Sequence, residues 1–285
     1  MTEHIAARIG AAAIEAMLYE VAATPKPGLV DRSNNGAHRD MDYYTFMSSA
    51  AALRMSFDEF LTTGRQYSNR EVMRLLPELQ SCGRRAEQRM FAMTRGINTH
   101  KGMIFSLGLL CGAAGWLLPK GAFSIEVLCR TVAAMCTGIC KKAYGNLVKK
   151  ETLTKGERMY LLYGVAGVRG EAESGFYTVR KLSLPRYRQS RKLGCSINDA
   201  LVDTLLHLLA ETMDTNILGR HDMNTLLAAQ KRASEILKAG SIHTVQGRSM
   251  ILNLDEEFMK EYISPGGSAD LVAVTHFLYT LENLF

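Results

Sequence analysis

The amino-acid sequence predicts an all-α protein, and three observations support this fold class. Apolar residues mostly recur at intervals of three and four, the spacing of one helix face, and seldom at intervals of two. Glycine and proline gather in the segments between these periodic stretches. No linker divides the 285 residues into halves. We therefore expect a single compact multi-helix domain, residues 1–285, with about nine or ten helices.

Each expected helix corresponds to a segment with helical spacing of apolar residues. Ile5, Ile9 and Ala12 begin one apolar face near the start, and Leu201 and Leu205 lie on the clearest face further on. The most hydrophobic run, residues 103–118, is shorter than the roughly 20 apolar residues that span a membrane, so we expect a buried core helix. The expected helices cover residues 5–21, 42–60, 71–93, 103–118, 124–144, 155–163, 198–212, 223–239 and 268–284. We expect loops or helix ends over residues 24–41, 94–102, 164–178, 183–197 and 263–268.

Composition limits the class of protein. Apolar residues make up 47% and charged residues 22%, which excludes a wholly disordered chain, a collagen-like chain and an extended coiled coil. Lys and Arg number 34 and Asp and Glu 28, so the net charge of +6 favours anionic partners. Cations are interspersed with carboxylates and form no uniform stripe, so we expect no nucleic-acid partner.

The cysteines and the first residues predict the compartment. The six cysteines include no Cys-x-x-Cys pair, and Cys129, Cys136 and Cys140 recur on one apolar helical face without a nearby histidine. This pattern indicates reduced, buried thiols in a reducing cytosol. Residues 1–23 carry charges among small apolar residues and do not look like a targeting signal. We expect a cytoplasmic protein without a membrane partner.

The first polar segment that can carry chemistry is TPKPGLVDRSNNGAHRDMD, residues 24–42. Lys26 and Arg32 alternate with carboxylates such as Asp31, and His38 follows. This mixture suits a magnesium-bound polyphosphate, because cations bind phosphate oxygens and carboxylates bind the metal. A solvated surface loop in which Asp42 caps the next helix fits the same residues.

The second segment is GINTHKG, residues 96–102, directly before a predicted helix. The start of a helix has unpaired N–H groups and the positive end of the helix dipole. Asn98, Thr99, His100 and Lys101 therefore make a plausible phosphate seat. The spacing does not match a Walker loop.

The third segment is GVAGVRGEAESGF, residues 164–176. Glu171 and Glu173 can point the same way only in extended backbone, where they can hold a metal or act as a base beside Arg169. A helix start enriched in glutamate is the alternative, since the dipole favours carboxylates there.

Two further segments lie near the C-terminus. In ETMDTN, residues 211–216, Asp214 follows a predicted helix end, where a carboxylate is unfavourable unless a metal or an arginine offsets it. A fraying, solvated helix end is the alternative. In SPGGSADL, residues 264–271, Gly266 and Gly267 can curl N–H groups around an anion, with Ser268 as N-cap and Asp270 in the first turn. Simple capping explains these residues equally well.

These five segments, in this order, resemble the signature blocks of the triphosphoribosyl-dephospho-coenzyme A synthase family, which includes the CitG-type and MdcB-type proteins. The resemblance extends from about residue 10 to the C-terminus. It implies a single catalytic domain that joins ATP to the ribose 2′-hydroxyl of 3′-dephospho-coenzyme A and releases adenine. The product is the precursor of the prosthetic group of citrate lyase, which is loaded onto an acyl carrier protein.

Within the reaction that the resemblance implies, charge type and predicted loop position suggest roles for individual residues. Glu171 and Glu173 are expected nearest the anomeric carbon, and His38 or His100 is expected to give adenine its proton. Asp31, Asp214 and Asp270 are expected as ligands of Mg²⁺ or as carboxylates close to it. The expected nucleotide-binding residues are Lys26, Arg32, Asn98, Thr99, Lys101, Arg169, Gly266, Gly267 and Ser268.

Other functions stay open at this point. The same reaction can serve malonate decarboxylase, and a magnesium-dependent hydrolase of N-glycosidic bonds also uses carboxylates on a helical scaffold. A basic adaptor that binds coenzyme A groups or RNA is the alternative without catalysis. A homodimer is compatible with the sequence.

Overall fold

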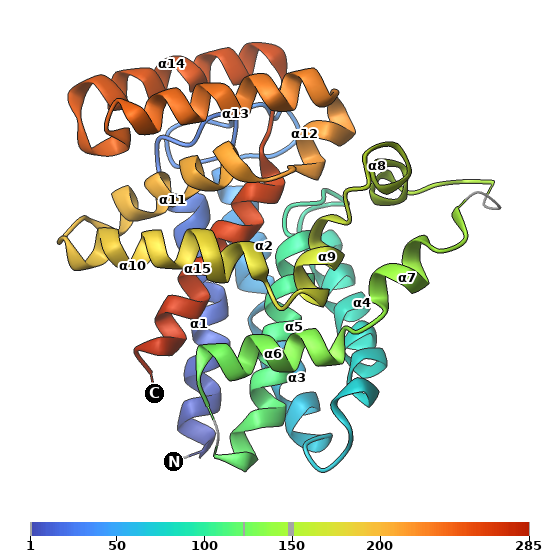
Figure 1. Cartoon of the computed structure of the whole chain (residues 1–285). Helices are drawn as coiled ribbons and strands as arrows, with labels where there is room; N and C mark the ends of the chain where they lie inside the picture. The colour runs from blue at the N-terminus through green and yellow to red at the C-terminus, as the bar shows by residue number, and fades with distance from the viewer. Residues whose placement is uncertain (1, 122, 148–150, 285) are drawn as a thin grey trace.

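The computed structural model describes residues 2–121, 123–147 and 151–284, and within these ranges every regular element is helical. The predicted all-α class is therefore confirmed (Figure 1). The α-helices are α1 (Thr2–Ala22), α2 (Tyr43–Ala52), α3 (Arg54–Gln66), α4 (Leu76–Met93), α5 (Lys101–Leu117), α6 (Ile125–Met135), α7 (Ile139–Tyr144), α8 (Lys155–Tyr163), α9 (Gly167–Glu173), α10 (Leu184–Lys192), α11 (Ile197–Glu211), α12 (Thr215–Arg220), α13 (Met223–Lys238), α14 (Val245–Glu261) and α15 (Gly266–Glu282). Short 3₁₀ segments cover Val72–Arg74, Leu118–Lys120 and Ser241–His243, and a π-helical turn covers Val179–Ser183.

Helix α5 is the centre of the molecule. It packs against α1, α3, α4, α6, α9 and α15, and nearly all its side chains beyond Gly102 are buried. The prediction of a buried core helix over residues 103–118 is confirmed. The helical segment Lys101–Lys120 is long and apolar enough to cross a membrane by length and composition. However, 72% of its most apolar 18 residues are buried inside the protein. This burial is what the central helix of a packed core requires.

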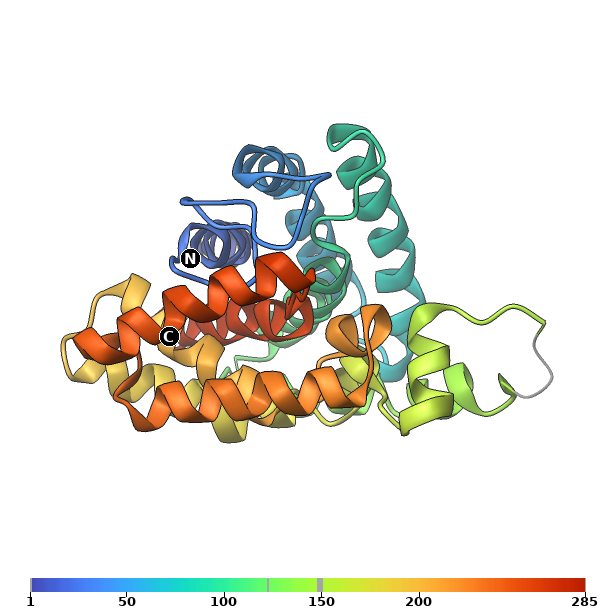
Figure 2. The ribbon, with the colours of Figure 1, turned by 90° about the horizontal axis from the view of Figure 1, so that it is seen from above.

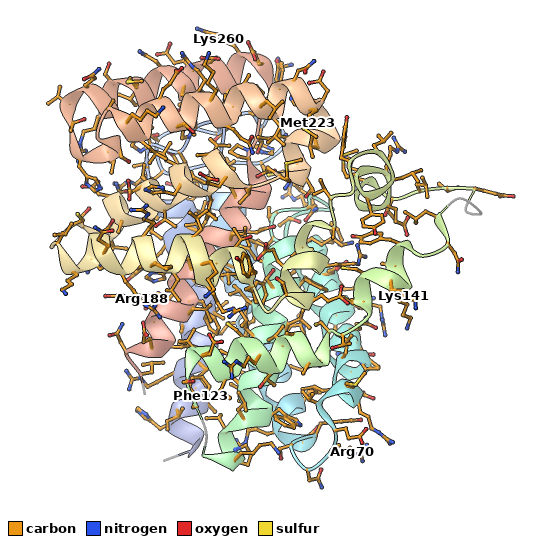
Figure 3. All side chains as sticks on the ribbon, in the orientation of Figure 1. Arg70, Phe123, Lys141, Arg188, Met223 and Lys260 are labelled. Atoms are coloured by element: carbon orange, nitrogen blue, oxygen red, sulfur yellow. The ribbon has the colours of Figure 1, made fainter. Side chains whose placement is uncertain are left out.

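The remaining helices surround α5 on several sides. The first and last helices, α1 and α15, pack side by side, and α13 packs on α11 and α14 to form an outer layer (Figures 1 and 2). One cluster of buried apolar side chains extends from Ile9 to Leu281. Basic side chains such as Arg70, Lys141 and Lys260 lie at the outer edges of the molecule (Figure 3).

The structure contains more helices than expected, in part because two predicted helices are broken. The segment 42–60 divides at Leu53 into α2 and α3, and α3 continues to Gln66. The segment 124–144 divides into α6, which ends at Met135, and α7, which begins at Ile139. Between them Gly138 has a φ of +80°, which does not fit a continuous helix. Both halves of each pair keep the same apolar spacing, so periodicity did not reveal the breaks.

Two segments expected to be loops or helix ends contain whole helices instead. Residues 164–178 include α9, and residues 183–197 include α10, which buries only Leu184, Tyr187 and Ser190. Helix α14 was not predicted either, although Ile251, Leu254 and Phe258 form its buried face. In α10 and α14 many charged residues occupy the solvent side, which obscures a narrow apolar stripe.

Helices α3 and α5 approach each other closely at glycines. A Cβ atom on Gly64 of α3 would lie 2.0 Å from the carbonyl oxygen of Gly112, and one on Gly115 would lie 2.1 Å from the carbonyl oxygen of Leu61. Side chains at these positions would push the two backbones apart. Glycine is therefore required here by packing.

We predict that Gly64→Ala lowers the free energy of unfolding by about 1–3 kcal/mol, the usual cost of overpacking a core. The control is Gly83→Ala in α4, where a Cβ atom would meet only Phe60 at 4.0 Å. That change should raise stability by up to about 1 kcal/mol, because alanine is the better helix former. Urea denaturation measures both. Equal effects of the two variants would contradict this account of the α3–α5 contact.

Candidate active site

Two cavities adjoin each other where several helices begin. One has a volume of about 390 Å³ and the other about 610 Å³. We call them the first and the second cavity. They share one wall, formed by Asn98, Lys101, Gly102, Thr215, Asn216 and Asp270. Three of the five segments that the sequence singled out contribute to this wall, and the other two line one cavity each.

The first cavity is rich in charge. Lys101, Lys155 and Arg220 supply positive charge, and Glu20 and Asp270 supply negative charge. The apolar part of the lining comes mainly from the segment before α2 and from α2 itself. These apolar side chains are Leu29, Val30, Met41 and Phe46.

The second cavity is larger and mixes apolar side chains with carboxylates. Phe105, Val165, Val168, Met213 and Leu271 give it apolar surface. Its charged residues, beyond the shared wall, are Arg169, Glu87, Glu171, Glu211 and Asp214.

Helix N-termini converge on both cavities. The first residues of α5, α8 and α15, which are Lys101, Lys155 and Gly266, line the first cavity. The short helices α9 and α12 also begin here, at Gly167 and Thr215. Each α-helix carries about half a positive charge at its N-terminus. The cavities therefore combine helix dipoles with cationic side chains, a combination that suits an anion.

Most polar residues of the segment 24–42 build the loop itself. Asp31 accepts hydrogen bonds from the N–H groups of Lys26, Ser33 and Asn34, at 3.1, 2.7 and 3.1 Å. Asp255 of α14 accepts bonds from Gly28 N and Asn34 Nδ2, at 2.9 and 2.8 Å. These contacts hold the loop against α14, as the blue segment beside α14 in Figure 2 shows. The alternative of a structural role thus applies to much of this segment.

Three charged residues of this loop also have partners within the protein. Lys26 is buried and forms an ion pair with buried Glu20, whose pKa is raised by burial. Arg32 is exposed and donates to Asn198 Oδ1 at 3.2 Å. Asp42 caps α2 by accepting a bond from Thr45 N at 2.7 Å, as the structural interpretation of the loop expected.

His38 is the predicted residue of this loop that reaches the first cavity. Its Nε2 lies 3.0 Å from Ser264 Oγ, and its Nδ1 lies 3.7 Å from Asp40 Oδ1. Burial, followed by the charge of Arg220, lowers the pKa of His38. The neutral imidazole is therefore favoured, and it can exchange hydrogen bonds with a bound ligand.

The segment 96–102 divides between the cavity wall and the core. Asn98, Thr99 and Lys101 line the cavities, and Lys101 Nζ forms an ion pair with Glu87 at 3.0 Å. His100 is fully buried and lines neither cavity. Its Nδ1 lies 2.8 Å from Ser49 Oγ, which accepts a bond from Thr99 Oγ1 at 2.7 Å. His100 thus supports Thr99 from behind.

The prediction that Glu171 and Glu173 lie in extended backbone is wrong, because both belong to α9. Their side chains diverge, as helical spacing requires. Glu171 lines the second cavity beside Arg169 and accepts bonds from Thr178, and burial raises its pKa. Glu173 lines neither cavity and accepts a bond from Gly138 N at 2.6 Å at the start of α7.

Asp214 joins the starts of two helices. The expectation that it follows a helix end unfavourably is corrected, because it is the N-cap of α12. Its Oδ1 accepts a bond from Asn216 N at 2.9 Å, and its Oδ2 accepts one from Ser268 N at 2.7 Å. Ser268 is not the N-cap of the last helix, since α15 begins at Gly266. Asp214 therefore anchors the beginning of α15 to the beginning of α12.

Asp270 stands apart from the other carboxylates. It lies in the shared wall, its side chain is partly exposed, and it has no hydrogen bond to any residue that the structure describes. Burial among protein atoms, together with the charges of Glu20 and Asp214, raises its pKa well above the usual range.

The structure brings together some predicted residues and separates others. The predicted residues that line a cavity are His38, Asn98, Thr99, Lys101, Arg169, Glu171, Asp214, Gly266, Gly267 and Asp270. Those that line neither cavity are Lys26, Asp31, Arg32, His100, Glu173 and Ser268. Residues that line the first cavity but had no predicted role are Glu20, Asp40, Lys155, Thr215, Asn216 and Arg220. Asp40 and Asn216 lie within segments that the sequence singled out, whereas nothing in the sequence around Glu20 indicates a site.

The described residues do not fit a resident metal ion. Among them there is no group of three or more His, Cys, Asp or Glu side chains that could hold one. Asp31 and Asp214, two of the expected ligands, already accept hydrogen bonds with both carboxylate oxygens. A magnesium ion in this site would therefore have to arrive with the phosphates of a nucleotide, the usual manner for Mg²⁺.

Comparison with known proteins identifies the family of this chain. Residues 6–285 match the family model of ATP:dephospho-CoA triphosphoribosyl transferase, CitG. A probable 2-(5″-triphosphoribosyl)-3′-dephosphocoenzyme-A synthase of Photobacterium profundum is 42% identical over 278 residues, 97% of this chain and 88% of that protein. A 2-(5″-triphosphoribosyl)-3′-dephosphocoenzyme-A synthase of Pectobacterium atrosepticum is 42% identical over 265 residues, 93% of this chain and 86% of that protein. No solved structure matches.

The protein is thus a helical transferase with two adjoining cavities. The chain belongs to the ATP:dephospho-CoA triphosphoribosyl transferase family. The resemblance drawn from the five sequence blocks is confirmed, and so is the class of reaction that it implied.

The buried imidazole of His100 predicts a pH dependence of stability. Burial, followed by the charge of Lys26, lowers the pKa of His100 to about 3, whereas an unfolded histidine titrates near 6.5. Below pH 6.5 the unfolded chain gains a proton that the folded protein does not bind, so stability falls as the pH falls.

Between pH 7.5 and pH 5 this single group should cost about 2 kcal/mol. The variant His100→Asn keeps a polar group near Ser49 but cannot titrate in this range. Urea denaturation at both pH values should therefore show a smaller loss for the variant by about that amount. An identical loss in both proteins would mean that His100 does not contribute.

Proposed function

We propose that the protein transfers the triphosphoribosyl group of ATP to the 2′-hydroxyl of 3′-dephospho-coenzyme A, releases adenine and forms 2′-(5″-triphosphoribosyl)-3′-dephospho-coenzyme A. Besides membership of the family, one observation supports this most directly: two cavities meet at a common wall. A reaction between two large nucleotides needs a separate space for each substrate and a junction where the reacting atoms meet.

The first cavity suits the triphosphate. The two substrates together carry roughly five or six negative charges near pH 7. Lys101, Lys155 and Arg220 lie around the first cavity, where α5, α8 and α15 begin. Cationic side chains and helix N-termini together are the usual means of holding phosphate groups in proteins.

The second cavity suits the acceptor. It is the larger of the two and offers apolar surface from Phe105, Val168 and Leu271, against which the long pantetheine arm can pack. Arg169 can pair with the pyrophosphate of the acceptor. Asn98 and Asn216 reach both cavities and can hold the two riboses by hydrogen bonds.

The chemistry follows from these positions. Substitution at the anomeric carbon passes through a state with oxocarbenium character, which a nearby carboxylate stabilises. Glu171 in the second cavity supplies such a carboxylate. His38 in the first cavity can donate a hydrogen bond to the departing adenine. Magnesium enters as the counterion of ATP.

The proposal extends to the setting of the reaction. The product would be passed on for loading of an acyl carrier protein of citrate lyase, with malonate decarboxylase as the alternative destination. The reaction would take place in the cytoplasm, and two copies of this chain would form a homodimer.

The purified protein should release adenine from ATP only when Mg²⁺ and 3′-dephospho-coenzyme A are both present. Chromatography measures adenine, and mass spectrometry measures the joined product. ATP without acceptor is the control. Adenine released from ATP alone would instead indicate a hydrolase of N-glycosidic bonds, and no adenine under any condition would indicate a binding adaptor.

The two glutamates of α9 should differ in their effects. Glu171→Gln should lower kcat for adenine release by about 10²-fold, since it removes a charge beside the reacting sugar. Glu173→Gln should change kcat little and cost about 1 kcal/mol of stability, because that carboxylate accepts a bond from Gly138 N. Steady-state kinetics and urea denaturation of both variants test this. A loss of kcat with Glu173→Gln equal to that with Glu171→Gln would contradict the assignment.

A further inference from the structure

We propose that Asp270 is the general base that takes the proton from the 2′-hydroxyl of the acceptor, an inference that rests on the proposed transfer reaction. Among the described residues, Asp270 is the only carboxylate that lines both cavities. The acids of the first cavity alone are Glu20 and Asp40. A base for this reaction must stand where the acceptor hydroxyl meets the donor sugar, which is the shared wall.

Asp270 is also available for such a role, whereas its neighbours are engaged. Glu20 is paired with Lys26, and Glu87 is paired with Lys101 at 3.0 Å. Asp214 accepts hydrogen bonds with both of its oxygens. The carboxylate of Asp270 is bound to no described donor, so its oxygens can accept a bond from a ligand.

A glycine makes room for this carboxylate. A Cβ atom on Gly102 would lie 1.8 Å from Asp270 Oδ2 and 2.7 Å from Asp270 Cγ. Gly102 is the second residue of α5, and its φ lies outside the left-handed region, so most other residues would suit the helix backbone better. The space left at Gly102 therefore serves Asp270, and Gly102 is a positioning residue.

The surroundings tune this carboxylate for proton transfer. Burial, with the charges of Glu20 and Asp214, raises the pKa of Asp270 well above its usual range, which makes it a stronger base. The start of α5 beside it and Lys101 of the shared wall favour its ionised form.

The proposed step balances as follows. The 2′-oxygen of the acceptor forms a bond to the anomeric carbon of ATP while the bond from that carbon to adenine breaks. The hydroxyl proton goes to Asp270, and adenine leaves with the electron pair of the broken bond and takes up one proton from the medium. Asp270 then releases its proton to solvent, so no net proton is gained or lost.

The test compares Asp270→Asn, Asp270→Glu and Gly102→Ala with the wild type and with Glu282→Gln, which alters an exposed carboxylate at the far end of the same helix. Asp270→Asn should lower kcat by about 10² to 10⁴-fold. The Kd for ATP, measured by calorimetry, and the Mg²⁺ concentration for half-maximal rate should stay within about threefold of wild type. The fall of kcat on the acidic side of its pH profile should disappear.

Gly102→Ala should lower kcat without lowering the melting temperature, and Asp270→Glu should restore part of the rate. Glu282→Gln should behave as wild type. An Asp270→Asn variant that keeps more than about a tenth of the wild-type kcat overturns the role, since a general base supplies more than that. A parallel loss of ATP binding, or a large rise in the Mg²⁺ requirement, also overturns it and assigns Asp270 to ligand or metal binding. A wild-type protein that releases no adenine from the two substrates would instead overturn the proposed function itself.

Discussion

The convergence of helix N-termini on two joined cavities is the constraint on which the rest of the structure depends. Helices α5, α8 and α15 begin at the first cavity, so their positive dipole ends face the same space. Asp214 accepts the N–H of Ser268 in the first turn of α15, and Asp270 lines both cavities.

The close packing of α5 serves this arrangement. Glycines let α3 approach α5 so closely that the central helix is buried along its length. The start of α5 is thereby held firmly, with Lys101 and Gly102 in the wall between the cavities. Asp214 ties the starts of α12 and α15 together in the same region. Core packing and helix capping thus position the residues that line the two cavities.

The polar loop before α2 illustrates why residue type alone is a weak guide to a role. Its composition of cations and carboxylates is what a polyphosphate site needs. Yet Asp31 and Asn34 satisfy backbone and side-chain partners of the loop and of α14, and Lys26 neutralises buried Glu20. The loop still reaches the first cavity through His38. A polar segment can therefore be essential to a site mostly by holding its own shape.

Sequence by itself determined the helical class, the buried central helix and the family, because apolar periodicity and ordered motif blocks are local properties of the chain. It also located the segments that line the cavities, since helix starts and glycine turns are visible in the residue order. Only the tertiary structure decided which side chain of each segment faces the ligand space. Glu171 reaches a cavity while Glu173 contacts α7, and Lys101 reaches one while His100 lies in the core. Such choices depend on how helices far apart in the sequence pack together, and residue spacing does not contain that information.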